Sequence, residues 1–313
     1  MKARLVVLAI MLVCVLAILG QLAKAATPAQ RQDRYPAWSP DGSSLAFVSR
    51  TGAVGRIELV GADGRGLRAL TAPQPAPWGL TWAPDGSAIA YVSADHIWRV
   101  DVADRKVTQL TNLVEDDMQP QWSPDGGEIA FTRFEDCFRC TTIYAMPATG
   151  GTPRVLVPND GVRHAVWSPD GSEFVDSSGA IRSSADGSFV ARVGFGSSYD
   201  WSNRGIAWVS GGNVYVGSPD GTSIRRVAES PGAVATVARW SRNGQRIAFG
   251  LDGWLAVAAT NTSSWHRVIR ASVANDAPTW APNGTIAYVE PNRCGIDTIL
   301  ADRTHHRRLT HDC

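Results

Sequence analysis

The sequence predicts an all-β protein, a β-propeller of four-stranded antiparallel blades, with seven blades as the expected number and six as the alternative. Three observations carry this prediction. A unit of about 40 residues repeats along the 313-residue chain. Within each unit, short runs such as 44–48 and 56–60 have the alternating pattern of strands and are separated by Gly-rich turns. Each unit is too small to bury both faces of its sheet alone, so the units must stack around a ring.

The repeat is clearest in its first three copies. It reads Tyr-Pro-Ala-Trp-Ser-Pro-Asp-Gly-Ser-Ser-Leu-Ala-Phe-Val-Ser at 35–49, and similar sequences follow at 79–93 and 119–132. The tryptophans that anchor the copies are 44, 40, 45, 34, 39 and 40 residues apart, which leaves no room for a second domain. We expect each of them to pack between adjacent blades. They are Trp38, Trp82, Trp122, Trp167, Trp201, Trp240 and Trp280.

Four strands are expected in each unit. Strand A ends at the tryptophan, strand B has the Leu-Ala-Phe-Val type, strand C the Ile-Tyr-Ala or Val-Tyr-Val type, and strand D ends in Leu-Thr or similar residues. Ser-Pro-Asp-Gly suits the A–B turn, because Pro presets φ, Asp bonds to nearby backbone and Gly takes the left-handed position. Since neighbouring strands are antiparallel, the A–B and C–D turns share one face, the short-turn face. The B–C and D–A connections share the other, the long-loop face.

The Pro-x-Trp-Ser-Pro-Asp-Gly-x-x-Ile-Ala-Phe unit closed by Leu-Thr resembles the WD-like repeat of the TolB-type propeller, also seen in the propellers of prolyl-oligopeptidase relatives. The resemblance covers 35–310, with the motif altered at Trp240 and Trp280 and shortened at Trp201. TolB has a separate α/β domain before a six-bladed propeller, and the peptidase relatives carry a hydrolase domain; neither is recognised here. The resemblance therefore implies the propeller architecture more than a role like that of TolB.

The first 25 residues are expected to be a signal peptide. Lys2 and Arg4 precede a charge-free run over 5–23, and Ala23-Lys24-Ala25 places small residues where a signal peptidase reads them. We expect cleavage after Ala25, a short linker over 26–34 and the propeller over 35–313. An uncleaved membrane anchor is the alternative. The mature protein is expected to be exported, periplasmic or extracellular, without a membrane span.

Charge and motifs exclude several classes of function. Thirty Lys and Arg balance 29 Asp and Glu, and the mature chain has 27 against 29, so no basic field attracts nucleic acid. The sequence has no G-x-S-x-G elbow, phosphate-binding loop, dinucleotide glycine motif or H-E-x-x-H. We therefore expect a monomeric binding module for a protein or a cell-envelope component, without catalytic residues. No cofactor is predicted; a calcium ion on backbone carbonyls of the channel is compatible with the sequence but is not predicted.

The candidate binding residues are acidic and lie in the long-loop connections. Variable loops on a rigid scaffold commonly carry binding, so an acidic rim there would suit a basic partner. The alternative is an ordinary solvated loop surface, since runs of charge often serve only solubility. The rim residues are Glu115, Asp116, Asp117, Glu135, Asp136, Asp160 and Asp276.

Two further residues keep a second class of function open. His164 begins the fourth strand A, near the channel mouth, and Asp200 lies in the fifth. Some TolB-like propellers are polysaccharide lyases with metal-binding histidines in the channel, so the resemblance implies a carbohydrate-active enzyme as the alternative. A single suitably placed histidine is too few to carry that metal site over. Loss of function through these channel residues, rather than through the loops, would indicate the enzyme.

Four cysteines remain after the leader, an even number that favours disulfides in an exported chain. Cys294 lies in the B–C loop of the last unit and Cys313 follows its strand D, so a bond between them would tie down the C-terminus. Cys137 and Cys140 form C-x-x-C in the equivalent loop of the third unit, where a local disulfide is expected. A thioredoxin-like redox site is not expected, because it would need a βαβ context. A four-cysteine zinc site is not expected either, because blades three and seven would lie nearly opposite each other on the ring.

Overall fold

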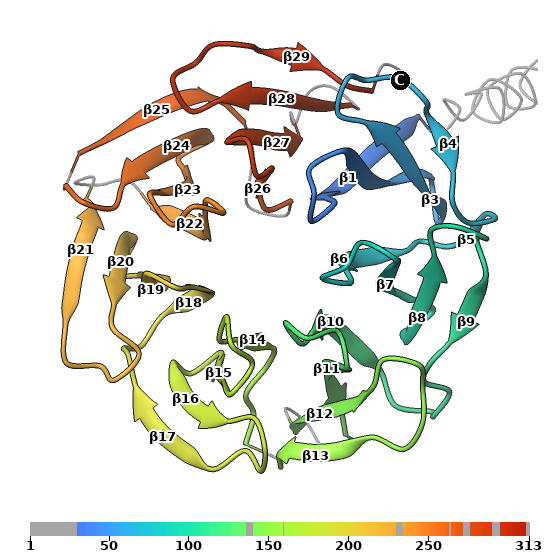
Figure 1. The fold of residues 1–313 in the computed structure, drawn as a ribbon, viewed down its shortest axis with the longest axis horizontal. Helices are drawn as coiled ribbons and strands as arrows, with labels where there is room; N and C mark the ends of the chain where they lie inside the picture. The colour runs from blue at the N-terminus through green and yellow to red at the C-terminus, as the bar shows by residue number, and fades with distance from the viewer. Residues whose placement is uncertain are drawn as a thin grey trace, which may run out of the picture. The chain divides into compact units, whose positions relative to one another are not determined.

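The computed structural model describes residues 30–135, 140–158, 160–229, 234–262, 264–271, 276–289 and 295–310. The chain divides into two units, Met1–Gln30 and Arg31–Cys313. Only Gln30 of the first unit is described, so the predicted signal peptide lies outside the described residues. The second unit is all-β in its described part and forms a ring of seven blades (Figure 1). Seven rather than six blades is therefore the correct count.

The first four blades follow the chain in order. Blade 1 contains β1 (Arg31–Trp38), β2 (Ser44–Thr51), β3 (Val54–Gly61) and β4 (Arg68–Ala69), with a short extra strand, β5 (Gln74–Pro75), paired to β3. Blade 2 contains β6 (Trp78–Trp82), β7 (Ala88–Ser93), β8 (His96–Asp101) and β9 (Val107–Gln109). Blade 3 contains β10 (Asp117–Trp122), β11 (Glu128–Phe134), β12 (Thr141–Pro147) and β13 (Arg154–Val157). Blade 4 contains β14 (Ala165–Trp167), β15 (Glu173–Asp176), β16 (Ala180–Ser183) and β17 (Phe189–Arg192).

The last three blades repeat this order. Blade 5 contains β18 (Ser197–Ser202), β19 (Gly205–Ser210), β20 (Asn213–Gly217) and β21 (Ile224–Ala228). Blade 6 contains β22 (Ala235–Trp240), β23 (Arg246–Leu251), β24 (Trp254–Ala259) and β25 (Trp265–Arg270). Blade 7 contains β26 (Thr279–Trp280), β27 (Thr285–Val289), β28 (Ile296–Leu300) and β29 (Arg307–Arg308). In every blade the first strand lies nearest the centre of the ring (Figure 1).

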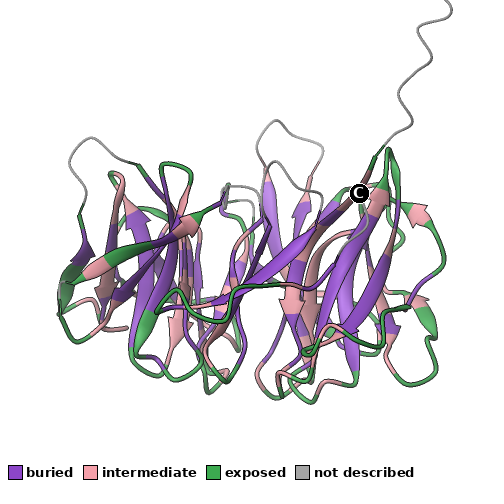
Figure 2. Cartoon of the chain, turned by 90° about the horizontal axis from the view of Figure 1, so that it is seen from above, coloured by how far each residue is buried: buried purple, intermediate pink, exposed green. Residues whose placement is uncertain are grey.

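The hydrophobic core lies between the blades. Each of the seven clusters of buried apolar residues joins two adjacent blades, and the seventh joins blade 7 to blade 1. The second strands are the most completely buried, as β7 shows, because they are covered by neighbours on both faces. Figure 2 shows this burial along the strands and the exposed residues at the turns. No blade can therefore keep its core without the next one.

The repeated tryptophans pack between blades, as predicted, and four of them also form hydrogen bonds there. Trp82 Nε1 donates to the Ala37 carbonyl of blade 1 at 2.9 Å, and Trp122 Nε1 donates to the Thr81 carbonyl of blade 2 at 3.1 Å. In each pair the acceptor is the residue just before the tryptophan of the preceding blade. Trp167 and Trp280 repeat the bond to the carbonyls of Gln121 and Arg239.

The A–B turns have the predicted chemistry. Asp41 Oδ1 accepts hydrogen bonds from Ser39 Oγ at 2.6 Å and from the Ser43 backbone N–H at 3.0 Å. Gly42 follows in the left-handed region, with φ of 72°. The bond from Ser39 is the main reason why the pKa of Asp41 lies below its ordinary value. The turn Asp is thus a structural acceptor, as the sequence indicates.

In the described part of the chain, side-chain contacts rather than an exchanged strand close the ring. Blade 1 and blade 7 are each built from consecutive strands of their own. Asp276, at the start of blade 7, pairs with Arg34 at 2.8 Å and accepts from the Tyr35 backbone N–H at 3.0 Å. On the short-turn face, a Cβ on Gly42 would lie 2.6 Å from Pro282 Cδ, so only glycine allows this approach. The joint between the two ends of the chain is therefore packed as closely as the others.

Candidate functional sites on the two faces and at the centre of the ring

The long-loop face exposes apolar side chains in its D–A connections. Between β9 and β10, Val114 is 98% exposed and Leu113 48% exposed. Phe195, between β17 and β18, and Val234, before β22, are also exposed. Because every D–A connection lies on the same face of an antiparallel blade, all four side chains point to solvent from the long-loop face or its edge. Surface of this kind is what protein interfaces use when it is contiguous.

The predicted acidic rim contains both exposed and buried carboxylates. Glu115 is half-buried and Asp116 exposed, and neither side chain forms a hydrogen bond or ion pair with another described residue. Asp117 is instead fully buried, and Arg133 holds it through Nε–Oδ1 at 2.7 Å and Nη2–Oδ2 at 2.9 Å. A buried bidentate pair of this kind fixes the strand and leaves no free charge for a partner. The accessible acidic residues of this loop are therefore Glu115 and Asp116.

The other predicted rim residues are dispersed over several blades. Glu135 is half-buried and accepts a hydrogen bond from Tyr144 Oη at 3.1 Å. Asp160 is exposed and pairs with Arg182 at 2.8 Å. Asp276 is buried at the joint of blades 7 and 1. Asp136 lies outside the described residues. Of the predicted rim, Glu115 and Asp116 therefore lie together, whereas Asp276 joins blades 7 and 1 instead of facing a partner.

Of the four cysteines that follow the predicted leader, the structure describes only Cys140, which is half-buried and disulfide-bonded. Cys137, Cys294 and Cys313 lie outside the described residues. The pairing of Cys137 with Cys140 and that of Cys294 with Cys313 therefore stay predictions.

The innermost strands share a bulge that the repeat pattern does not reveal. Three residues before the tryptophan, six of the seven blades have a residue with positive φ, and the A–B pairing slips by a residue around this position in blades 1, 2, 3, 5 and 6. The bulge frees backbone N–H groups for the preceding blade: the Ala238 N–H, next to the bulge, donates to Ser198 Oγ at 3.1 Å. The six residues are Tyr35, Gly79, Gln119, His164, Ser198 and Val237.

The positive charge of Arg239, on β22, affects the pKa of both predicted channel residues, His164 and Asp200. Burial first, and the positive charge of Arg239 second, lower the pKa of His164 to about 4, so the imidazole is neutral at pH 7. Burial raises the pKa of Asp200, while Arg239 and backbone N–H groups oppose that rise. A neutral imidazole, a shielded carboxyl group and a guanidinium thus lie on blades 4, 5 and 6 in one arc of the ring.

The hydrogen bonds of these residues also hold adjacent blades together. Asp200 Oδ2 accepts from the Trp240 backbone N–H at 2.6 Å and so ties blade 5 to blade 6. Arg239 Nη1 donates to Ser198 Oγ at 3.0 Å, again across the same two blades. His164 donates its backbone N–H to Thr132 Oγ1 of blade 3 at 2.9 Å. Asp200 and Arg239 use their side chains in these bonds, whereas the imidazole of His164 has no hydrogen bond to another described residue and is available to a ligand.

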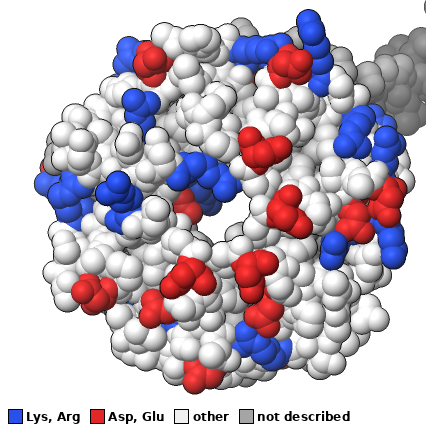
Figure 3. Space-filling view, in the orientation of Figure 1, with Lys and Arg blue, Asp and Glu red and all other residues white. Residues whose placement is uncertain are grey.

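The short-turn face is divided by charge around the central opening. Figure 3 shows acidic side chains beside the opening on one side and basic side chains over blades 5 and 6. The A–B turns explain the division, because blades 5 and 6 replace the usual turn residues with Arg204 and Arg242. The sequence-based prediction did not include this face. The basic residues in the turns of the fifth and sixth repeats, whose counterparts in the first four repeats carry Asp, could have indicated it. The turns of the first four blades carry Asp41, Asp85, Asp125 and Asp170.

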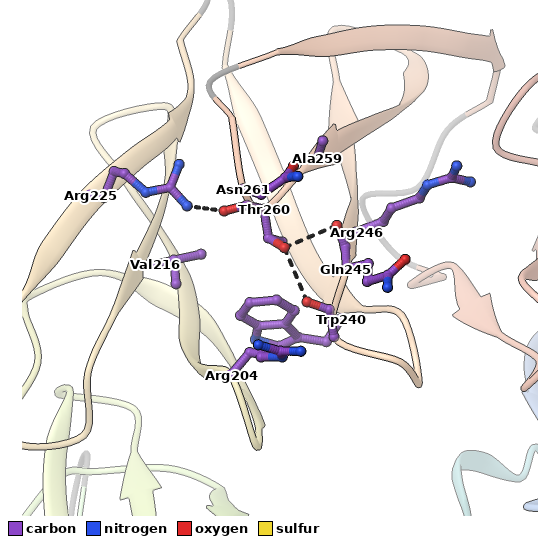
Figure 4. A pocket seen from close by; sticks show the side chains of 10 residues that line it. Arg204, Val216, Arg225, Trp240, Gln245, Arg246, Ala259, Thr260 and Asn261 are labelled. Atoms are coloured by element: carbon purple, nitrogen blue, oxygen red, sulfur yellow. Dashed lines mark hydrogen bonds between the residues drawn. The ribbon is translucent and has the colours of Figure 1, made fainter.

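A groove of about 610 Å³ opens on this face between blades 5 and 6. It lies between β20 and β21 of one blade and the A–B and C–D turns of the next, with Trp240 at its base (Figure 4). Arg204, Arg225 and Arg246 line it. A groove of about 440 Å³ occupies the equivalent position between blades 1 and 2.

Comparisons with known proteins support the fold. No protein-family model and no curated protein sequence matches the chain. Among solved structures, it is similar to an oligogalacturonate lyase in complex with manganese, with a TM-score of 0.69 and 16% identity over 84% of this chain and 87% of that one. It is also similar to a putative TolB from Agrobacterium tumefaciens, with a TM-score of 0.52 and 18% identity over 82% and 88% of the two chains.

A third similar structure is also a β-propeller. It is the β-propeller domain of the Trilobed protease from Pyrococcus furiosus, described as having an open velcro topology, with a TM-score of 0.67 and 12% identity over 92% of this chain and 98% of that one. Identities this low show the fold alone. The chain therefore has a TolB-like β-propeller fold, here with seven blades, whose outline is shared with oligogalacturonate lyases.

Proposed function

We propose that the chain is an exported, non-catalytic binding module that docks a protein of the cell envelope on its long-loop face. The observation that carries the proposal is the exposed pair Leu113 and Val114, followed directly by Glu115 and Asp116. Apolar side chains beside carboxylates that have no ion pair within the described part suit a partner with an apolar contact and basic side chains around it. The predicted leader and the likeness to TolB structures support an envelope location.

Capture of partners from native envelope extracts tests this function. The mature chain, 26–313, is the bait, and bound proteins are identified by mass spectrometry. Two variants are compared with it: Leu113→Ser with Val114→Ser, and Glu115→Gln with Asp116→Asn. The control is Val190→Ser, because Val190 is also half exposed but lies on β17, within an outer strand. A protein that the control retains and both loop variants lose supports the proposal, and one retained equally by all four proteins contradicts it.

A carbohydrate-active enzyme is the second candidate, and the arc of His164, Asp200 and Arg239 favours it. The neutral imidazole of His164 could accept a proton, and Arg239 acts electrostatically on both His164 and Asp200. The manganese of the similar lyase structure has no counterpart set of ligands here, because the described residues bring no three His, Cys, Asp or Glu side chains together. Incubation with oligogalacturonate, followed by product analysis, tests this candidate. Cleavage that His164→Gln abolishes and the loop variants leave intact would establish it.

A further inference from the structure

Two grooves on the short-turn face occupy the same position of the repeat and differ in charge. Between blades 1 and 2, the lining includes Arg68 together with Asp41 and Asp85. Between blades 5 and 6, Arg225 stands in the position of Arg68. Arg204, like Asp41, is the third residue after the tryptophan, in an A–B turn that is two residues shorter. The first groove is therefore lined by one positive and two negative side chains, whereas the charged side chains of the second groove are all positive.

The positive charge of the blade 5–6 groove has no counter-charge of its own. Its third arginine is Arg246. No Asp or Glu belongs to the described lining, and neither Arg204 nor Arg246 has an ion-pair partner among the described residues. Like-charged side chains around a groove focus a positive potential in it, and that potential is relieved when an anion binds.

Arg225 is held in place across the groove. Its Nη2 donates to the Thr260 carbonyl and its Nη1 to the Thr262 carbonyl at 3.2 Å, both in the C–D turn of blade 6. Figure 4 shows Arg225 reaching from blade 5 towards Thr260, whose own hydroxyl is bonded to the backbone beneath. A guanidinium fixed in this way binds a ligand at a smaller entropic cost than a free surface side chain.

The base of the groove differs from the equivalent places where the tryptophan is bonded to the preceding blade. Trp240 is 7% exposed, and its Nε1, like that of Trp38, has no acceptor among the described residues, although Trp82, Trp122, Trp167 and Trp280 each donate to the preceding blade. The strand-C residue beside it is Val216, whereas the equivalent Arg99 lies over the Trp122 ring at 5.7 Å. The shorter Val216 side chain leaves open the space that Arg99 fills.

We propose that the groove between blades 5 and 6 binds a small anionic ligand through its carboxylate or phosphate groups. Arginine presents paired N–H donors that match both kinds of group. A volume of about 610 Å³ is within the range of sites for small molecules. The site lies on the face opposite the long loops, so it goes beyond the docking function proposed above and does not depend on it.

Calorimetric titration of the mature chain with three probes tests the site: inorganic phosphate, citrate and trigalacturonate. We expect saturable one-site binding of at least one probe that weakens as salt is added. Arg204→Asp reverses the charge of an exposed side chain in the A–B turn of blade 5, and thermal unfolding checks that the variant folds. This variant should weaken binding about tenfold or more. Arg68→Ala, in the equivalent groove between blades 1 and 2, is the matched control and should bind as the unchanged protein does.

The outcomes are distinct. Tighter binding of citrate and trigalacturonate assigns the ligand to carboxylates, and tighter binding of phosphate assigns it to phosphates; either one supports the site. No saturation with any probe overturns it, as does an equal loss of binding in Arg204→Asp and Arg68→Ala. Capture of a protein partner by the long-loop face should be unchanged in Arg204→Asp, so failure of this site and failure of the docking function are distinguishable.

Discussion

Arg34 of the first strand and Asp276 at the start of the last blade form an ion pair, with Nε 2.8 Å from Oδ2. Asp276 is 3% exposed and Arg34 27% exposed, so the pair is largely shielded from solvent. The second carboxylate oxygen of Asp276 accepts the Tyr35 N–H, which fixes the backbone of blade 1 as well. The pair therefore acts across the one joint of the ring that no connecting loop crosses.

Asp276→Ala should destabilise the ring by about 2 kcal/mol, because Arg34 loses its buried counter-charge and the Tyr35 N–H loses its acceptor. Equilibrium denaturation with urea measures the change. Asp160→Ala is the control: its pair with Arg182 is more than half exposed at the carboxylate, so less than about 1 kcal/mol is expected. Equal effects in the two variants would show that the joint of blades 7 and 1 does not depend on Asp276.

Trp122→Phe should cost more stability than Trp240→Phe. Both side chains are almost equally buried, but only Trp122 donates a hydrogen bond to the preceding blade, to the Thr81 carbonyl at 3.1 Å. Its replacement leaves that carbonyl without its donor, at a cost of about 1 kcal/mol beyond the loss of volume that both variants share. Thermal and urea unfolding of the two variants give the difference, and a larger loss in Trp240→Phe would refute the argument.

Stability should fall in acid as the turn carboxylates gain protons. Hydrogen bonds from Ser and backbone groups lower the pKa of Asp41, Asp125 and Asp170 below 3.8 in the folded chain. Their ionised forms therefore stabilise the fold fully above the unfolded value, and this contribution is lost as the pH falls through the lower folded values.

The matched variant for this prediction changes all three residues to Asn. Asn243 shows that the turn accepts the amide, since its Oδ1 receives bonds from Ser241 Oγ at 2.8 Å and the Gln245 N–H at 3.1 Å. Unfolding free energies measured from about pH 5 down to about pH 2 should decline less steeply in the triple variant than in the unchanged protein. Parallel curves would show that these carboxyl groups do not cause the acid dependence.

His164 should make the fold sensitive to pH in a higher range. Its pKa is lowered from 6.5 to about 4 on folding, so the neutral form is favoured in the folded chain. The unfolded chain then takes up the proton first, and stability falls as the pH decreases from 6.5 towards 4. His164→Gln removes this contribution, and its unfolding free energy should vary less over that range. An unchanged slope would mean that the imidazole is exposed in solution.

The repeat alone predicted most of the fold, because six of the seven innermost strands end at their tryptophan and the strands between them follow the alternation of apolar residues. The long-loop site was less predictable. Asp116 and Asp117 are neighbours in sequence, yet one is exposed and the other pairs with Arg133, because Asp116 still belongs to the loop and Asp117 is the first residue of β10. The blade 5–6 groove depends on contacts between two repeats, namely Val216 beside Trp240, and a pattern read within one repeat cannot show them.

The closure of the ring by side chains has a consequence for how the chain could be rearranged. Each blade is a complete, consecutive set of four strands, so the position of the chain ends within the ring is arbitrary as far as strand pairing is concerned. A circular permutant that joins the present ends and opens a D–A connection other than the one with β5, between blades 1 and 2, would keep every sheet intact. The non-covalent joint would then lie between two other blades. For the same reason, gene duplication could add or remove whole blades without changing the strand pairing of the others.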